Sequence, residues 1–229
     1  MTRETPPPMP VDDTPLTRTP NLLTTVVVAA IALLVYLSAA MFIKPFKSPA
    51  WSMSPTIRPH DRFYIEKLTY MFHDPQRGDI IVFRTDGIPT PGVIKSTYYF
   101  KRVAGIPGDR IGIVPPNLIV NGQPLKEPAI FATISSCRGG YGGFSPADPV
   151  TPGALLTSPT NEVFLGEGEF YVLGDNTRNS WDSRYWGPVP RKNIVGRVIA
   201  IYWPLNRLQT VTSNGPTLPS ILPGESMTN

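Results

Sequence analysis

Cysteine and histidine are scarce in this chain. Its single cysteine, Cys137, excludes an intramolecular disulfide and a CxxC-type metal site, and we interpret it as structural or incidental. A zinc hydrolase or a Ser-His-Asp enzyme would have to use His60 or His73, the 2 histidines of the chain. We expect no metal ion and no cofactor.

Long helical patterns are also lacking. The 229 residues include 28 prolines and 19 glycines, which exclude a helical bundle, a coiled coil and a helical repeat. The net charge of +4 comes without a cluster of basic residues between aromatic ones, so we expect no nucleic-acid partner. The apolar content of 41% is nevertheless enough for a hydrophobic core.

One long uncharged run stands near the start of the chain. Residues 22–43 are apolar or small, and a helix of this length spans about 33 Å, enough to cross a hydrocarbon core of about 30 Å. A cleavable signal peptide is the nearest alternative, because Ser38, Ala39 and Ala40 are small enough for its cleavage site. The run is long for that role and lacks a basic start, so we predict an uncleaved transmembrane anchor over 21–43. Residues 1–20 are rich in proline, and we predict a disordered tail there.

The charges around this anchor leave its orientation open. Counting Lys and Arg on either side would place the C-terminal part of the chain in the cytoplasm. Long domains, however, cross membranes largely regardless of flanking charge.

After residue 44 the sequence changes to short apolar runs separated by turns. The runs rich in β-branched and aromatic residues predict a mainly β domain over 44–210. Asn121 and Gly122 predict a type I′ hairpin turn, whereas 63–72 is compatible with a strand or a short helix. We expect 129–160 to form a surface excursion and 211–229 a flexible tail. The predicted strands are 79–84, 98–105, 110–114, 117–120, 162–166, 169–174 and 195–203.

Lys101 lies in one of these strands and has two interpretations. Alternation along the strand would point its side chain to solvent. Burial among Tyr99, Phe100 and Val103 would instead lower its pKa and leave a neutral amine, which can act as the general base for a serine hydroxyl. The scarcity of histidine makes a Ser-Lys pair attractive in this chain.

Four ordered segments together resemble the type I signal peptidase family, the bacterial leader peptidases. The nucleophile segment of that family, Ser-Met-x-Pro-Thr, is matched at 52–56, and its Lys-Arg with Gly-x-Pro-Gly-Asp is matched at 101–109. A segment similar to Gly-Asp-Asn-x-x-Asn-Ser-x-Asp-Ser-Arg-x-Trp-Gly occupies 174–187, and a Gly-Asp-x-Val-x-Phe-like segment occupies 78–83. The resemblance covers about residues 44–205 and includes the preceding anchor.

The resemblance implies a role for each matching residue. Ser52 would be the acylating nucleophile, Lys101 its general base, and Ser180 the residue that hydrogen-bonds and orients the lysine. Two ion pairs would brace the site, and they are Asp182 with Arg184 and Asp175 with Arg102. Shallow pockets for small side chains at the −1 and −3 positions of the substrate would be lined by Met53, Ile57, Tyr99 and Phe100. Without the resemblance, these apolar residues would be interpreted as core.

The resemblance also implies that the mainly β domain over 44–210 is an antiparallel β-sheet catalytic domain. It further implies a membrane-bound serine endopeptidase that removes N-terminal signal peptides from exported preproteins. Its partners would be the signal peptides, the lipid bilayer and an export translocon. Signal peptides are cut after translocation, so the catalytic domain would lie on the periplasmic or extracytoplasmic side of the bacterial inner membrane, behind a single-pass anchor. Ser52 follows closely after the anchor, which places it near the membrane surface.

The sequence departs from the family pattern at two places. Many members carry Ser or Thr two residues before the nucleophile to bind the oxyanion, and this chain has Ala50 there. The hole would then depend on the Ser52 backbone N–H, another group or water. Thr177 and Arg178 replace a frequent Arg-Asp pair, which leaves the local ion-pair pattern open.

Other classes fit less well. A self-cleaving protease of the phage-repressor type uses Ser and Lys on a related β fold, but it carries a DNA-binding domain and no membrane span. A penicillin-binding enzyme would need Ser-x-x-Lys and Lys-Thr-Gly motifs, which do not occur. A non-enzymatic β domain held at a membrane is the alternative from a different class.

Overall fold

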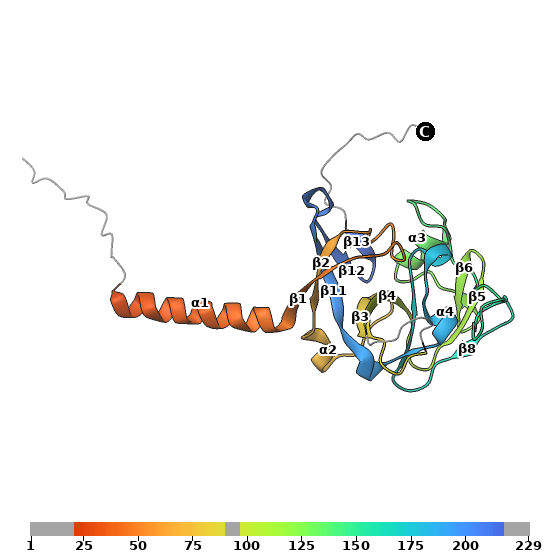
Figure 1. Cartoon of the computed structure of the whole chain (residues 1–229), viewed down its shortest axis with the longest axis horizontal. Helices are drawn as coiled ribbons and strands as arrows, with labels where there is room; N and C mark the ends of the chain where they lie inside the picture. Colours follow the sequence, from red (N-terminus) through yellow and green to blue (C-terminus); the bar gives the residue numbers. More distant parts are fainter. Residues whose placement is uncertain (1–20, 90–96, 218–229) are drawn as a thin grey trace, which may run out of the picture. The chain divides into compact units, whose positions relative to one another are not determined.

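The structure is a computed structural model that describes residues 21–89 and 97–217 (Figure 1). The predicted disordered tail over 1–20 and the end of the predicted flexible tail, 218–229, lie outside the described residues. The described residues divide into two compact units, with a boundary between Ala40 and Met41.

The first unit contains most of helix α1, Leu22–Phe42. Its 21 residues carry no charged side chain, and by length and composition the helix can cross a membrane. At about 1.5 Å per residue it reaches about 31 Å, close to the thickness of a hydrocarbon core. The predicted anchor therefore corresponds to one helix, which ends one residue before the predicted boundary at 43.

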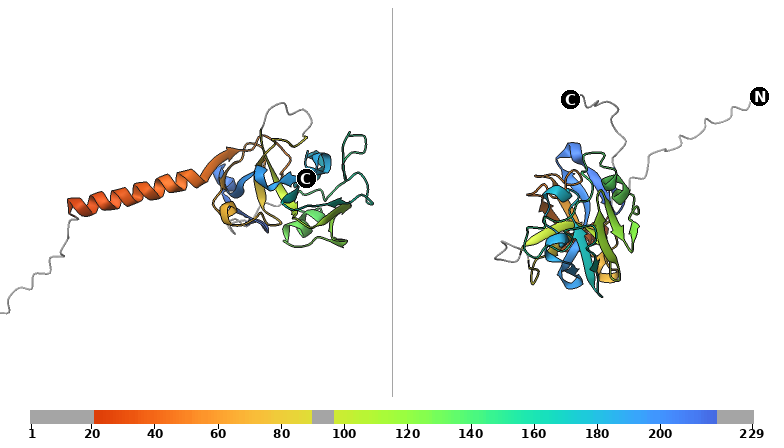
Figure 2. Two further views of the ribbon diagram at one scale, coloured as in Figure 1. Left: turned by 90° about the horizontal axis from the view of Figure 1, so that it is seen from below. Right: turned by 90° about the vertical axis from the view of Figure 1, so that its right-hand side faces the viewer.

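The second unit is built on two antiparallel sheets. Among the described residues, nine strands form the larger sheet, in the order β1-β2-β11-β3-β4-β9-β10, with β12 pairing with β11 and β13 with β12. Four strands form the smaller sheet, in the order β7-β6-β5-β8. The two sheets lie side by side in Figures 1 and 2. The strands of the larger sheet are β1 Ile43–Lys47, β2 Arg62–Glu66, β3 Ile80–Arg84, β4 Tyr98–Gly105, β9 Glu169–Leu173, β10 Val189–Pro190, β11 Ile194–Trp203, β12 Gln209–Thr212 and β13 Gly215–Thr217. Those of the smaller sheet are β5 Arg110–Val114, β6 Asn117–Val120, β7 Gln123–Pro124 and β8 Val163–Phe164.

Helices are short in this unit. The predicted ambiguity over 63–72 resolves into both alternatives, because β2 is followed directly by helix α2. Asn121 and Gly122 connect β6 to β7 with φ values of 53° and 80°, as the predicted type I′ turn requires. The helices are α2 Thr69–Phe72, α3 Ile130–Ser135 and α4 Ser183–Trp186, with single 3₁₀ turns η1 Thr177–Asn179, η2 Arg191–Asn193 and η3 Leu205–Arg207.

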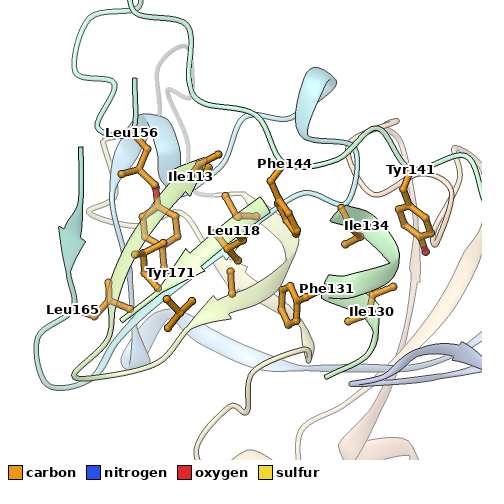
Figure 3. Packing of buried hydrophobic residues seen from close by; sticks show 14 residues of the cluster. Ile113, Leu118, Ile130, Phe131, Ile134, Tyr141, Phe144, Leu156, Leu165 and Tyr171 are labelled. Atoms are coloured by element: carbon orange, nitrogen blue, oxygen red, sulfur yellow. The ribbon is translucent and has the colours of Figure 1, made fainter. Parts of the chain in front are cut away.

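The expectation of a surface excursion over 129–160 is wrong. Helix α3 buries Ile130, Phe131 and Ile134 against the smaller sheet, and Tyr141 and Phe144 extend the same cluster (Figure 3). Each buried side chain of this size contributes roughly 1.5–3 kcal/mol of hydrophobic stabilisation. The segment therefore supplies one wall of a core, although its glycines and prolines are typical of a surface loop.

The expected flexible tail is also wrong for residues 211–217. Strands β12 and β13 form a hairpin that pairs with β11, and Val211 is buried in a second core cluster. The polar and proline-rich composition of this stretch did not predict the two strands, because a two-stranded hairpin at a sheet edge needs few apolar side chains.

Candidate active site

A cavity of about 510 Å³ opens on the larger sheet beside the turn that follows β1. Its walls are strongly aromatic, and both candidate catalytic residues belong to them. The lining residues are Pro49, Ala50, Trp51, Ser52, Thr97, Tyr98, Tyr99, Phe100, Lys101, Asn179, Trp181 and Trp186.

The two candidate catalytic side chains are in direct contact. Nζ of Lys101 lies 2.9 Å from Oγ of Ser52, and it also donates a 3.2 Å hydrogen bond to the Phe100 carbonyl oxygen. Both residues are buried, with 5% of Lys101 and 8% of Ser52 exposed. The sequence placed these residues together by resemblance alone, since they are 49 positions apart.

The position of β4 explains why Lys101 is buried. The strand lies inside the larger sheet between β3 and β9, with Lys101 opposite Ile81, and both of its faces are covered from Phe100 onward. Because both faces of the strand are covered there, the side chain of Lys101 points into the protein and not to solvent. Burial lowers the pKa of its amine from 10.5 to about 8, partly opposed by the carboxylates of Asp182 and Asp175. A large part of the lysine is therefore neutral at mildly alkaline pH.

Backbone contacts hold the turn that carries Ser52. The Ser54 N–H donates to the Trp51 carbonyl at 3.0 Å, and the Ile57 N–H donates to the Met53 carbonyl at 2.9 Å. From the segment after β9, the Asn176 N–H donates to the Ser52 carbonyl at 3.0 Å. Asn176 lies within a motif that the sequence singled out, yet its contact with Ser52 was not predicted.

The expected ion pair between Arg102 and Asp175 is present and fully buried. The guanidinium donates from Nε and Nη2 to the two carboxylate oxygens, each at 2.7 Å, and Nη1 donates to the Gly78 carbonyl at 2.7 Å. Because Arg102 follows Lys101 in β4, this pair fixes the strand on the side away from the lysine. Bidentate geometry of this kind restricts both partners.

The expected pair between Asp182 and Arg184 is also present and buried. Nε and Nη2 of Arg184 donate to the two carboxylate oxygens at 2.8 and 2.9 Å. The Gly174 N–H donates to the same carboxylate at 3.0 Å, and Arg184 also donates to the Ser180 carbonyl at 3.0 Å. This pair ties helix α4 to the chain that leaves β9.

Ser180 does not make the predicted contact. Its hydroxyl is buried and has no hydrogen-bond partner in the part of the chain that the structure describes. The residue nonetheless lies at the site, since a Cβ added to Gly174 would be 2.2 Å from its Oγ and 2.4 Å from the Ser52 carbonyl oxygen. Because Gly174 has no side chain, the segments that carry Ser52 and Ser180 can lie this close together.

Two of the four residues expected to line the substrate pockets lie at the cavity. Tyr99 and Phe100 line the cavity, whereas Met53 and Ile57 are fully buried in the second core cluster with Phe63 and do not line it. Their apolar character alone indicated core, and that interpretation holds. The aromatic walls also include Trp51, Tyr98, Trp181 and Trp186, and no spacing in the sequence predicts that these side chains meet.

Most of the chain is similar to known proteins. The family model for signal peptidase, peptidase S26, matches residues 21–203. A signal peptidase I of Leptolyngbya laminosa is 35% identical over 90% of this chain and 92% of its own length. A probable signal peptidase I-2 of Synechocystis is 34% identical over 83% of this chain and 74% of its own length. A probable chloroplastic thylakoidal processing peptidase 2 of Arabidopsis thaliana is 30% identical over 73% of this chain and 40% of its own length. The match over most of the chain, together with the buried serine and lysine in contact, shows that this protein belongs to the signal peptidase S26 family.

Proposed function

We propose that the protein removes N-terminal signal peptides from preproteins, with Ser52 as nucleophile and Lys101 as general base. The observation that carries the proposal is the 2.9 Å contact between Ser52 Oγ and a buried amine whose pKa is lowered to about 8. A neutral amine at this distance can accept the serine proton, which is the task of histidine in a triad.

The reaction then runs through an acyl-enzyme. Lys101 takes the Ser52 proton while Oγ bonds to the carbonyl carbon of the scissile peptide, and the carbonyl oxygen becomes an oxyanion. When the C–N bond breaks, the ammonium of Lys101 gives the proton to the leaving amine. The neutral amine next takes a proton from water, whose oxygen attacks the ester, and that proton returns to Ser52 as the ester bond breaks.

The oxyanion needs a donor that the side chain at Ala50 does not supply. The backbone N–H of Ser52 donates no hydrogen bond within the described residues, so it is free to bind the oxyanion. The Ala50 carbonyl already accepts from the Ser48 hydroxyl at 3.2 Å, which fixes the peptide before the nucleophile. We assign the oxyanion hole to the Ser52 N–H, with water as a second donor.

The aromatic walls favour small residues at the cleavage site. Tyr99 and Phe100 line the cavity next to Lys101, with ring centroids 5.6 and 5.7 Å from its Nζ, and we propose that these rings keep the substrate pockets shallow. Alanine at −1 and −3 fits such shallow pockets, and larger side chains are excluded by steric clash.

Helix α1 anchors the enzyme in a membrane in this proposal. Residues 21–43 span the bilayer once, the catalytic domain over 44–217 lies on the extracytoplasmic side, and an export translocon delivers the substrate. The bacterial inner membrane is the proposed location. The relative named as a thylakoidal processing peptidase makes a thylakoid membrane the alternative.

The test uses the full-length protein in lipid vesicles and a synthetic preprotein with alanine at −3 and −1. Ser52→Ala and Lys101→Ala abolish cleavage if the proposal is right, and Lys101→Arg fails as well because a guanidinium keeps its proton. A double variant with His60→Asn and His73→Ala is the matched control and retains activity. Asparagine is chosen at position 60 because the backbone φ there is 71°, which it tolerates. Loss of activity in this control with the dyad intact would show that a histidine is the base.

A further inference from the structure

Residues 140–146 contact two segments of the proposed catalytic site, the turn that carries Ser52 and the stretch over 177–184. A Cβ on Gly140 would lie 3.6 Å from the ring of Pro55, in the nucleophile turn. The Gly143 carbonyl accepts from the Thr177 hydroxyl at 2.7 Å, and the Ser145 carbonyl accepts from Arg184 at 2.8 Å. The stretch that was expected to be a surface excursion thus runs along the back of the site.

Tyr141 makes the most informative of these contacts. Its hydroxyl lies 2.8 Å from Oγ1 of Thr56, which in turn donates a short hydrogen bond to Asp175. Tyr141 sits at one end of the first core cluster, with its ring packed among apolar side chains (Figure 3). Thr56 and Asp175 are each 1% exposed, so water does not replace these partners.

The direction of the hydrogen bonds follows from the donors available. Asp175 is held by two guanidinium N–H groups of Arg102 and acts as acceptor only, so the single hydroxyl hydrogen of Thr56 points to it. Tyr141 must then donate to Thr56. Burial and the charge of Asp175 raise the pKa of the phenol, so it stays protonated and keeps this donor.

We propose that Tyr141 is a positioning residue for the reaction, acting on Ser52 through Thr56. The chain of contacts runs from the Tyr141 hydroxyl to Thr56, then to Asp175 and to Arg102, the neighbour of Lys101 in β4. Thr56 lies in the turn that carries the nucleophile, and Arg102 lies in the strand that carries the base. Tyr141 thereby fixes the separation of the two reacting groups from outside the cavity. The inference depends on the dyad proposed above.

The decisive variant is Tyr141→Phe, which keeps the ring and removes the hydroxyl. Its matched control is Tyr171→Phe, because Tyr171 is fully buried and its hydroxyl has no partner within the described residues. We expect kcat for the synthetic preprotein to fall about tenfold in Tyr141→Phe, with KM within about twofold of wild type, because a small misplacement affects the chemical step most. Tyr171→Phe retains the wild-type kcat.

Variants at Thr56 test the route. Thr56→Val removes the same link and lowers kcat to a similar extent, whereas Thr56→Ser restores most of what valine loses. The double variant of Tyr141→Phe and Thr56→Val is no slower than the slower single variant, because both act on one chain of contacts.

Four results separate the possibilities. A wild-type kcat in Tyr141→Phe overturns the inference. An equal loss of kcat and of melting temperature in Tyr141→Phe and Tyr171→Phe also overturns it, because the effect is then general to buried tyrosines. Multiplying losses in the double variant overturn the route through Thr56. Cleavage by Ser52→Ala or Lys101→Ala instead overturns the proposed dyad, which is a distinct outcome.

Discussion

The burial of Lys101 predicts how cleavage depends on pH. Its pKa of about 8, against 10.5 for an ordinary lysine, corresponds to roughly 3 kcal/mol of destabilisation of the charged form. Only the neutral amine can take the Ser52 proton. About one tenth of the amine is neutral at pH 7 and about nine tenths at pH 9, so kcat/KM rises about tenfold between these values.

The assay measures initial rates on the synthetic preprotein in vesicles from pH 6 to 10.5, with the substrate well below its KM, where the profile reports the free enzyme. The variant with His60→Asn and His73→Ala is run in parallel, because an unchanged acid limb excludes titration of a histidine. A rate that is flat from pH 7 to 9, or an acid limb near 10.5, would refute the assignment of the buried amine as base.

Three further predictions concern single positions. Lys101→Met stabilises the folded protein at pH 7 by up to about 3 kcal/mol, and the gain disappears as the pH rises from about 8 to 10.5, because the folded wild type binds fewer protons than the unfolded chain in that window. Urea unfolding in micelles at both ends of the window checks this, and a gain independent of pH contradicts it. Gly174→Ala lowers kcat on the order of 100-fold, since the added Cβ would be 2.4 Å from the Ser52 carbonyl oxygen. Gly112→Ala, where the nearest atom would be 3.5 Å away, is the control, and equal rates in the two variants would exclude the steric argument. Ala50→Ser raises kcat by less than about 100-fold with little change in KM, because a hydroxyl there would bind the oxyanion mainly in the transition state. An unchanged or lower kcat shows that the hole is already complete.

Local patterns in the sequence predicted the elements that depend on local chemistry. The strand predicted over 98–105 has the same bounds as β4, because its β-branched and aromatic residues fill a central position in the sheet. The turn at Asn121 and Gly122 follows from residues that tolerate a left-handed backbone. The uncharged run before residue 43 likewise predicted helix α1.

Contacts between distant segments could not be predicted from local sequence patterns. Tyr141 and Thr56 are 85 positions apart, and neither residue type signals a partner at that distance. The stretch around Tyr141 is rich in glycine, so its composition indicated a surface loop although its few apolar side chains are buried. Motif resemblance located Ser180 at the site, but it did not predict that the hydroxyl would be without a partner in the described residues.

The two buried ion pairs also affect the pKa of Lys101. The carboxylates of Asp182 and Asp175 each raise the pKa of the lysine, and alone they would favour the protonated form that cannot act as a base. Each carboxylate is bound by an arginine, and Arg184 itself lowers the pKa of the lysine. The guanidinium groups thus let two acidic residues organise the chain around Ser52, while burial still has the largest effect on the pKa of the amine. Removing either arginine would expose the lysine to an uncompensated carboxylate and, for a buried pair, destabilise the fold by about 3–5 kcal/mol. The two arginines therefore hold the site together, and Arg184 also offsets part of the effect of the carboxylates on the pKa of Lys101.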